Sequence, residues 1–100
     1  MSIPVYQPTL NENVFNYVKD CLDSTWISSH GKYISKFEDE FAKYINIKHA
    51  TSVCNGTAAL HLALSVLSLK EGDEIIVPTL TYIASVNAIS YVGAKPVLCD

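Results

Sequence analysis

Apolar residues recur at helical spacing through the first part of the chain. A helix over about 10–23 is predicted, with an apolar face formed by Val14, Phe15, Val18 and Leu22. The run from Thr9 to Glu12 has the form of a capping box, which sets the start of this helix. A second helix is predicted to follow, with an apolar face formed by Ile34, Phe37, Phe41, Tyr44 and Ile45. Residues 1–48 are therefore expected to form a helical N-terminal arm.

From residue 49 the pattern changes to short apolar runs that alternate with helical runs. Strands are predicted at 50–54, 74–77 and 95–99, and helices at 57–69 and 81–92. Gly93 is a candidate C-cap for the last helix. The predicted strands begin about 21 to 24 residues apart, with a helix between each pair, which is typical of a parallel βαβ sheet. The fold class is therefore α/β, with residues 49–100 as a βαβαβ unit covered on both faces.

Composition limits what this chain does. It has 100 residues, 49% hydrophobic and 17% charged, with a formal net charge of -3. These values support one small core and exclude disorder as the main state. All seven basic residues are lysine, so arginine cannot recognise phosphate here, and nucleic-acid binding is disfavoured. No apolar run is long enough to span a membrane, so no membrane association is expected. The start of the chain, Met1 to Pro4, has no basic region and no hydrophobic stretch, so no signal peptide is expected.

Cys21, Cys54 and Cys99 are odd in number and far apart. This spacing predicts neither a metal site nor a disulfide framework, and we expect small buried side chains in a reducing compartment. The sequence stops at Asp100, directly after a strand pattern, and we expect it to be the front part of a larger protein.

The best local candidate for chemistry follows the first predicted strand. Ligands of open α/β sheets lie beyond the carboxyl ends of the strands. There Asn55, Gly56 and Thr57 lead from a strand into a helix, whose N-terminal N–H groups can bind an anion. The alternative is an ordinary turn with Thr57 as N-cap.

Other candidates are aromatic side chains and a histidine. Tyr82 begins a helix at the same edge and either stacks on a planar ligand or is a core aromatic. Trp26 and Ser28 lie in an aperiodic loop, where they either carry function or, for Trp26, anchor the loop. His61 is expected to be a partly buried, satisfied side chain.

Several runs in a fixed order carry a family resemblance. They are Trp26 to Ser29, Phe37 to Ala42, Asn55 to Leu64, Gly72 to Ile89 and Gly93 to Val97. Together the runs resemble the DegT/DnrJ-type sugar aminotransferases, which are pyridoxal-phosphate (PLP) enzymes of fold type I, the aspartate-aminotransferase fold. The resemblance covers nearly the whole chain. It implies that residues 49–100 begin the large PLP-binding domain and that residues 1–48 form an arm before it.

The resemblance also implies roles for single residues. The turn of Gly56, Thr57 and Ala58 would hold the cofactor phosphate, and Tyr82 would stack on the pyridine ring. The loop of four residues, Trp26, Ile27, Ser28 and Ser29, would border the sugar-nucleotide pocket. No metal is implied. The family further implies a cytoplasmic homodimer with active sites at the interface.

The implied activity is transfer of an amino group from an amino acid, with glutamate expected, to a nucleotide-linked 4-keto-6-deoxy sugar. The opening run from Ile3 to Pro8 and residues 20–29 are most similar to family members that form GDP-perosamine from GDP-4-keto-6-deoxymannose. Alternatives are a dTDP- or UDP-linked keto sugar, or a non-catalytic relative that keeps the fold as a regulatory or binding protein.

One departure from the family pattern limits the chain. The Schiff-base lysine and the aspartate that pairs with the pyridine nitrogen lie beyond residue 100 in the family. None of the seven lysines here lies in the matching motif, and Asp100 matches a strand-end acid instead. We therefore expect no catalytic residue in this chain, which would supply part of the cofactor site and part of the substrate wall.

Overall fold

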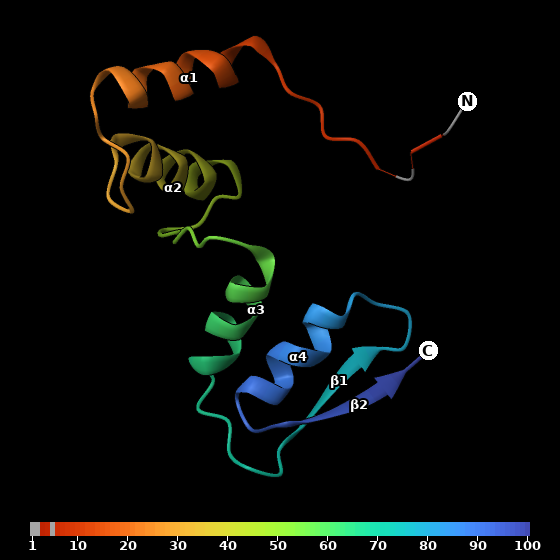
Figure 1. The fold of residues 1–100 in the computed structure, drawn as a ribbon. Helices are drawn as coiled ribbons and strands as arrows, with labels where there is room; N and C mark the ends of the chain where they lie inside the picture. The colour runs from red at the N-terminus through yellow and green to blue at the C-terminus, as the bar shows by residue number, and fades with distance from the viewer. Residues whose placement is uncertain (1–2, 5) are drawn as a thin grey trace. The chain divides into compact units, whose positions relative to one another are not determined.

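The computed structural model describes residues 3–4 and 6–100. The chain divides into two compact units, Met1–Ala50 and Thr51–Asp100, which we describe separately (Figure 1). Met1, Ser2 and Val5, which belong to the runs considered for a signal peptide and for the resemblance, lie outside the described residues.

The N-terminal unit is built from two helices, α1 (Glu12–Asp23) and α2 (Lys32–Tyr44). The predicted capping box is wrong. The N-cap of α1 is Asn11, whose side chain accepts the N–H of Asn13 at 3.1 Å, so the helix begins two residues later than predicted. Asparagine ranks above threonine as an N-cap, which accounts for the choice.

The second helix ends in a tight turn. Asn46 has a φ of 56°, and the N–H groups of Asn46 and Ile47 return to the carbonyls of Lys43 and Ala42. This is the Schellman arrangement, with asparagine in the left-handed position that glycine usually takes. It stops α2 directly before the chain extends toward residue 50.

The C-terminal unit contains α3 (Gly56–Ser65), β1 (Glu74–Pro78), α4 (Ile83–Tyr91) and β2 (Lys95–Cys99). The two strands are parallel, and Glu74 pairs with Lys95 at one end and Pro78 with Cys99 at the other. The core packs Val77, Ile89 and Ala94 against half-buried Leu64, Ile75, Val86 and Val92. Apolar residues of β1, of both helices and of the turn after α4 therefore share one small core.

Gly93 ends α4 as predicted. Its φ is 76°, its N–H donates to Ser90, and the N–H of Ala94 donates to Ile89. These two bonds form a second Schellman turn, which feeds the chain from α4 into β2.

The predicted strand at 50–54 is wrong. In the described part of the chain the sheet has two strands, so the predicted βαβαβ unit is a βαβ unit preceded by α3. A strand needs a hydrogen-bonded neighbour as well as an apolar pattern, and no strand pairs with this segment. Both C-terminal helices are also shorter than predicted, since α3 ends at Ser65 and α4 begins at Ile83.

Large apolar side chains remain exposed in both units. They include Phe15 and Leu22 on α1, Phe37 on α2, Leu60 on α3 and Ile76 on β1. The predicted burial of the cysteines is wrong, because Cys54 and Cys99 are exposed and Cys21 is half-buried. Over residues 3–4 and 6–100, no helix has the length and apolar character to cross a membrane, and no cluster of side chains suits a metal ion.

Candidate functional site

The carboxyl edge of the sheet carries the first cluster of predicted site residues. Beyond the paired ends of β1 and β2, the N–H of Thr79 donates to the carbonyl of Cys99 at 2.9 Å. A cavity of about 380 Å³ opens there, lined by Pro78, Thr79, Leu80, Cys99 and Asp100. Figure 1 shows that α3 and α4 both begin at the end of the unit toward which the strands point. The start of each helix therefore lies at the carboxyl edge of the sheet.

The first turn of α3 has its own cap. Asn55 is the N-cap, and its side-chain oxygen accepts the N–H of Ala58 at 2.9 Å, so the alternative in which Thr57 caps the helix is wrong. Within the described residues, no hydrogen bond is recorded for the N–H of Gly56 or of Thr57. The ranking of N-cap residues, with asparagine first, could have identified Asn55 from the sequence.

Gly56 borders open space. A Cβ built on Gly56 would meet no atom within 4 Å, so the fold itself does not require a glycine there. Thr57 is half-buried beside it and carries a hydroxyl. Two N–H donors, a hydroxyl and the positive end of a helix dipole form a set that suits a phosphate group.

Tyr82 occupies the N-cap position of α4, but its side chain makes no capping hydrogen bond to the helix. Its side chain is 79% exposed, so the alternative of a core aromatic is wrong. An exposed ring beside a helix start leaves a face on which a planar ligand can stack. Together with the donors of α3, this ring fits the phosphate and pyridine ring of the cofactor that the resemblance implies.

His61 differs from the expectation of a partly buried side chain. It is exposed on α3, with its ring edge-on to Tyr91 of α4 at 5.4 Å between centroids. The pair supports the packing of the two helices, and neither ring belongs to the first turn of α3.

The loop between α1 and α2 carries the second cluster. Trp26 donates its indole N–H to the carbonyl of His30, and the N–H of His30 is 3.4 Å from the hydroxyl of Ser28. The bond from Trp26 to His30 joins two residues of the same loop and so stabilises the loop. The Trp26 side chain is nevertheless 56% exposed. The alternatives of anchor and functional residue are therefore compatible.

This loop borders a cavity of about 410 Å³ in the N-terminal unit, lined by Cys21, Ser24, Trp26, Ser28, His30, Gly31, Lys32, Tyr33 and Ile34. Ile27 lines a neighbouring groove of about 420 Å³ between α1 and α2. Ser29 lines neither of them. The structure thus brings Trp26 and Ser28 together at one cavity and separates Ile27 from them.

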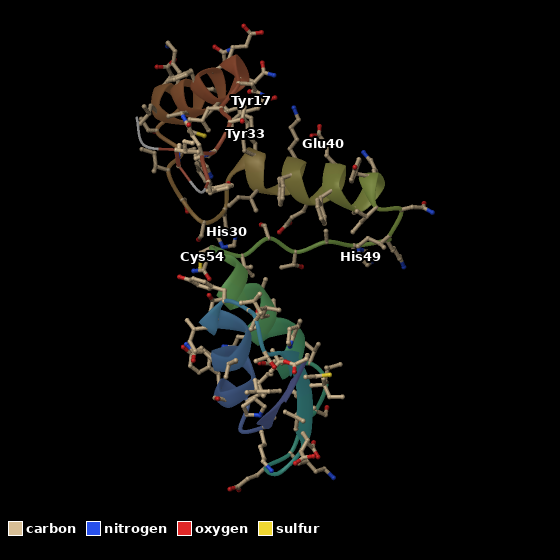
Figure 2. All side chains as sticks on the ribbon, turned by 90° about the vertical axis from the view of Figure 1, so that its right-hand side faces the viewer. Tyr17, His30, Tyr33, Glu40, His49 and Cys54 are labelled. Atoms are coloured by element: carbon tan, nitrogen blue, oxygen red, sulfur yellow. The ribbon has the colours of Figure 1, made fainter. Side chains whose placement is uncertain are left out.

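The sequence did not indicate the network at the base of this loop. Oδ2 of Asp20 on α1 accepts the Tyr33 hydroxyl at 2.9 Å and pairs with the Lys32 ammonium at 2.5 Å. The bonds from Lys32 and then Tyr33 lower the pKa of Asp20, while desolvation and the bond to Asp20 raise the pKa of Tyr33. Tyr17 lies beside Tyr33 (Figure 2), and the centroids of the two rings are 4.9 Å apart. The spacing of residues in the sequence shows which face of a helix each side chain lies on. It does not show which residues of another helix that face contacts, so this network could not be predicted.

Comparison with known proteins gives a consistent result. The model of the DegT/DnrJ/EryC1/StrS aminotransferase family matches residues 8–100. The GDP-perosamine synthase of Escherichia coli O157:H7 is 63% identical over 98 residues, which cover 98% of this chain and 27% of that protein. The chain therefore spans about a quarter of the length of the curated relatives that it matches.

Solved structures show the same likeness. A proposed sugar aminotransferase, Spr1654 from Streptococcus pneumoniae in its PLP form, is 38% identical with a TM-score of 0.88, over 100% of this chain and 25% of that one. A GDP-4-keto-6-deoxymannose-3-dehydratase mutant with bound GDP-perosamine is 28% identical, also with a TM-score of 0.88, over 99% and 27% of the two chains. These likenesses confirm the α/β fold class and the family resemblance.

Proposed function

This chain belongs to the DegT/DnrJ/EryC1/StrS aminotransferase family, and from that premise we propose that its protein is a PLP-dependent sugar-nucleotide aminotransferase. The protein transfers the amino group of glutamate to GDP-4-keto-6-deoxymannose and forms GDP-perosamine. The observation that carries this proposal is the 63% identity to a GDP-perosamine synthase across 98 residues. The match covers 98% of this chain, so it includes the segments of both candidate clusters.

Residues 49–100 supply one side of the cofactor site in this proposal. The N–H groups of Gly56 and Thr57 and the Thr57 hydroxyl bind the phosphate at the N-terminus of α3. The small side chain of Ala58 leaves the first turn accessible to the phosphate, while the N–H of Ala58 remains hydrogen-bonded to the side chain of Asn55. When bound, PLP acts as an electron sink that allows an amino group to leave one carbon and join another.

Tyr82 orients the cofactor ring. Its exposed side chain at the start of α4 offers a flat apolar face, and stacking needs the ring and not the hydroxyl. Held at its phosphate and on its ring, the cofactor keeps one orientation relative to the substrate.

The arm, residues 1–48, supplies part of the substrate wall. Trp26 offers an aromatic face, Ser28 and Ser29 offer hydroxyls, and Ile27 adds an apolar contact. An aromatic ring with neighbouring hydroxyls suits a sugar nucleotide, which has both flat apolar faces and many polar groups. We further propose that the protein is a homodimer. We also propose that it is located in the cytoplasm, a reducing compartment in which free cysteines such as these three are usual.

The test uses the full-length protein. Purified enzyme is supplied with PLP, 15N-labelled glutamate and GDP-4-keto-6-deoxymannose, and the sugar nucleotide is analysed by mass spectrometry. The proposal expects one labelled amino group in the product. Parallel reactions with dTDP- and UDP-linked 4-keto sugars identify the nucleotide that the enzyme prefers.

Three results would contradict all or part of the proposal. A dehydrated sugar without label would indicate the chemistry named for the dehydratase neighbour. No reaction with any keto sugar, although PLP binds, would indicate a non-catalytic relative. Labelled product from the dTDP or UDP sugar alone would overturn the GDP assignment and leave amino transfer standing.

A further inference from the structure

The loop between α1 and α2 is closed at its base by one carboxylate. Asp20 lies in the last turn of α1, whereas its two donors, Lys32 and Tyr33, lie in the first turn of α2. A single oxygen therefore ties together the two ends of the loop 24–31. The Tyr33 ring is itself fixed, because Tyr17 packs on it and the Lys32 ammonium lies 5.2 Å from its centroid.

A second anchor lies where the loop enters α2. A Cβ on Gly31 would be 3.0 Å from Cδ1 and 3.4 Å from Nε1 of the Trp26 indole. Gly31 has a φ of -125° and a ψ of 159°, which any residue adopts. A side chain at this position would therefore push the indole away by a few tenths of an ångström, whereas the backbone conformation itself suits any residue. The indole N–H, bonded to the carbonyl of His30, keeps the ring over this backbone.

The start of the loop also needs support. Thr25 has a φ of 56°, which is unfavourable for a β-branched residue. Such a conformation persists only where the surrounding structure fixes it. The carboxylate of Asp20 and the packing of Trp26 on Gly31 supply contacts on either side of Thr25.

We propose that Asp20 and Gly31 are positioning residues of the sugar-nucleotide site. Asp20 sets the separation of the loop ends, and Gly31 sets how closely the Trp26 ring approaches the backbone beside Ser28. The inference rests on the proposed function, in which Trp26 and Ser28 contact the substrate. Neither positioning residue has to touch the substrate, so their loss changes where the contact groups lie and not which groups are present.

The test compares Asp20→Asn, Gly31→Ala and Tyr33→Phe in the full-length, PLP-loaded enzyme. GDP-perosamine is titrated by calorimetry, and KM and kcat are measured for GDP-4-keto-6-deoxymannose and for glutamate. We expect the Kd and the sugar-nucleotide KM to rise about three- to tenfold, the scale of one misplaced contact. PLP affinity, the glutamate KM and kcat should remain at wild-type values, a pattern that general destabilisation does not produce.

Asp23→Asn is the matched control for the carboxylate. Asp23 also lies on α1 and pairs with a lysine, but its partner Lys19 is on the same helix, so no connection to α2 is lost. This variant should equal wild type in every measurement. If Asp20→Asn fails to fold, Tyr33→Phe tests the same anchor, because it removes only a hydroxyl and keeps the ring.

A double-mutant cycle tests Gly31. If this glycine acts by leaving room for the indole, Gly31→Ala should have no added effect on GDP-perosamine affinity in a Trp26→Ala background. Additive losses would overturn that part of the inference. Wild-type Kd and KM in both Asp20→Asn and Gly31→Ala would overturn all of it and leave the proposed function standing. A wild-type enzyme that neither binds GDP-perosamine nor aminates the keto sugar would defeat the proposed function, and the positioning roles with it.

Discussion

The side-chain oxygen of Asn55 lies 2.9 Å from the backbone nitrogen of Ala58 and caps α3. The cap uses the N–H of the third helical residue and leaves those of the first two, Gly56 and Thr57, for an acceptor outside the helix. One N–H group of the first turn of α3 thereby stabilises the helix, and two are left for the phosphate that we propose binds there.

This division predicts that two substitutions of Asn55 separate stability from cofactor binding. Asn55→Ala should lower the free energy of unfolding of the apo enzyme by about 1 kcal/mol, the usual cost of a lost N-cap. Asn55→Asp keeps an accepting oxygen and should leave stability near wild type, but its charge beside the phosphate should weaken PLP binding. Urea unfolding and absorbance titration measure the two effects. Equal PLP affinity in Asn55→Asp and wild type would place the phosphate elsewhere.

Gly56 and Thr57 should affect cofactor affinity without affecting the apo fold. Loss of the Thr57 hydroxyl in Thr57→Val should weaken PLP binding about tenfold to a hundredfold, since a hydrogen bond to a charged group contributes about 1.5–3 kcal/mol. Gly56→Val should cost more, because its side chain fills the open space where the phosphate approaches. The control is the thermal unfolding of the apo variants, which should match wild type. If the Gly56→Val enzyme bound PLP normally, this turn would be an ordinary helix start that does not bind the phosphate.

Tyr82 should act through its ring. Tyr82→Ala is expected to weaken PLP binding and shift the absorbance of the bound cofactor, whereas Tyr82→Phe should be nearly silent because the stacking face remains. Since the side chain is 79% exposed, neither variant should unfold the protein. A large loss of affinity in Tyr82→Phe would mean that the hydroxyl binds the cofactor and that the stacking role is wrong.

Gly93 should matter for stability alone. Its φ of 76° lies in the left-handed region, and its Schellman turn connects α4 to β2. Gly93→Ala should therefore lower the free energy of unfolding by about 1–2 kcal/mol. Gly56→Ala, at a helical position with open space, is the matched control and should lose no stability in the apo enzyme. Differential scanning calorimetry of the two apo variants distinguishes them.

The Asp20 connection should depend on pH with a definite sign. Its pKa is lowered by the bonds from Lys32 and Tyr33, so its stabilising effect is complete above the ordinary aspartate value of 3.8. The effect is lost as the pH falls through the lower folded value. The difference in unfolding free energy between wild type and Asp20→Asn should thus be constant near neutral pH and shrink only below about 3.8. A difference that disappears between pH 5 and 7 would contradict this assignment.

The sequence predicted the elements whose pattern is local. The amphipathic faces of α1 and α2 and the β-branched run at Glu74 to Val77 were found because each is determined by its own residues. The segment 50–54 was misassigned since its pattern is that of a strand, but a strand also requires a partner that local sequence does not specify. Cap choice failed in the same way at Thr9, where a nearby asparagine competes.

The candidate site was predictable only in its parts. Gly56, Thr57 and Tyr82 could be placed at one edge because strand ends and helix starts coincide in a parallel sheet. The network of Asp20, Lys32 and Tyr33 could not be found, because it joins residues of two helices whose relative rotation is set by packing. Gly31 had no local signal either, since only the position of Trp26 makes its missing side chain matter.

The register of β1 and β2 also has a consequence for the entropy of chain closure. Glu74 pairs with Lys95, so the first parallel ladder closes over about 21 residues, with α4 in between. Loop-closure entropy grows only slowly with length, and short closures favour rapid folding. The entropic cost of bringing β1 and β2 together is therefore small compared with that of a ladder between distant segments. Leu64 packs α3 against the core of this same β1–α4–β2 unit, so the turn at Gly56 is attached to the part of the chain with the shortest ladder closure.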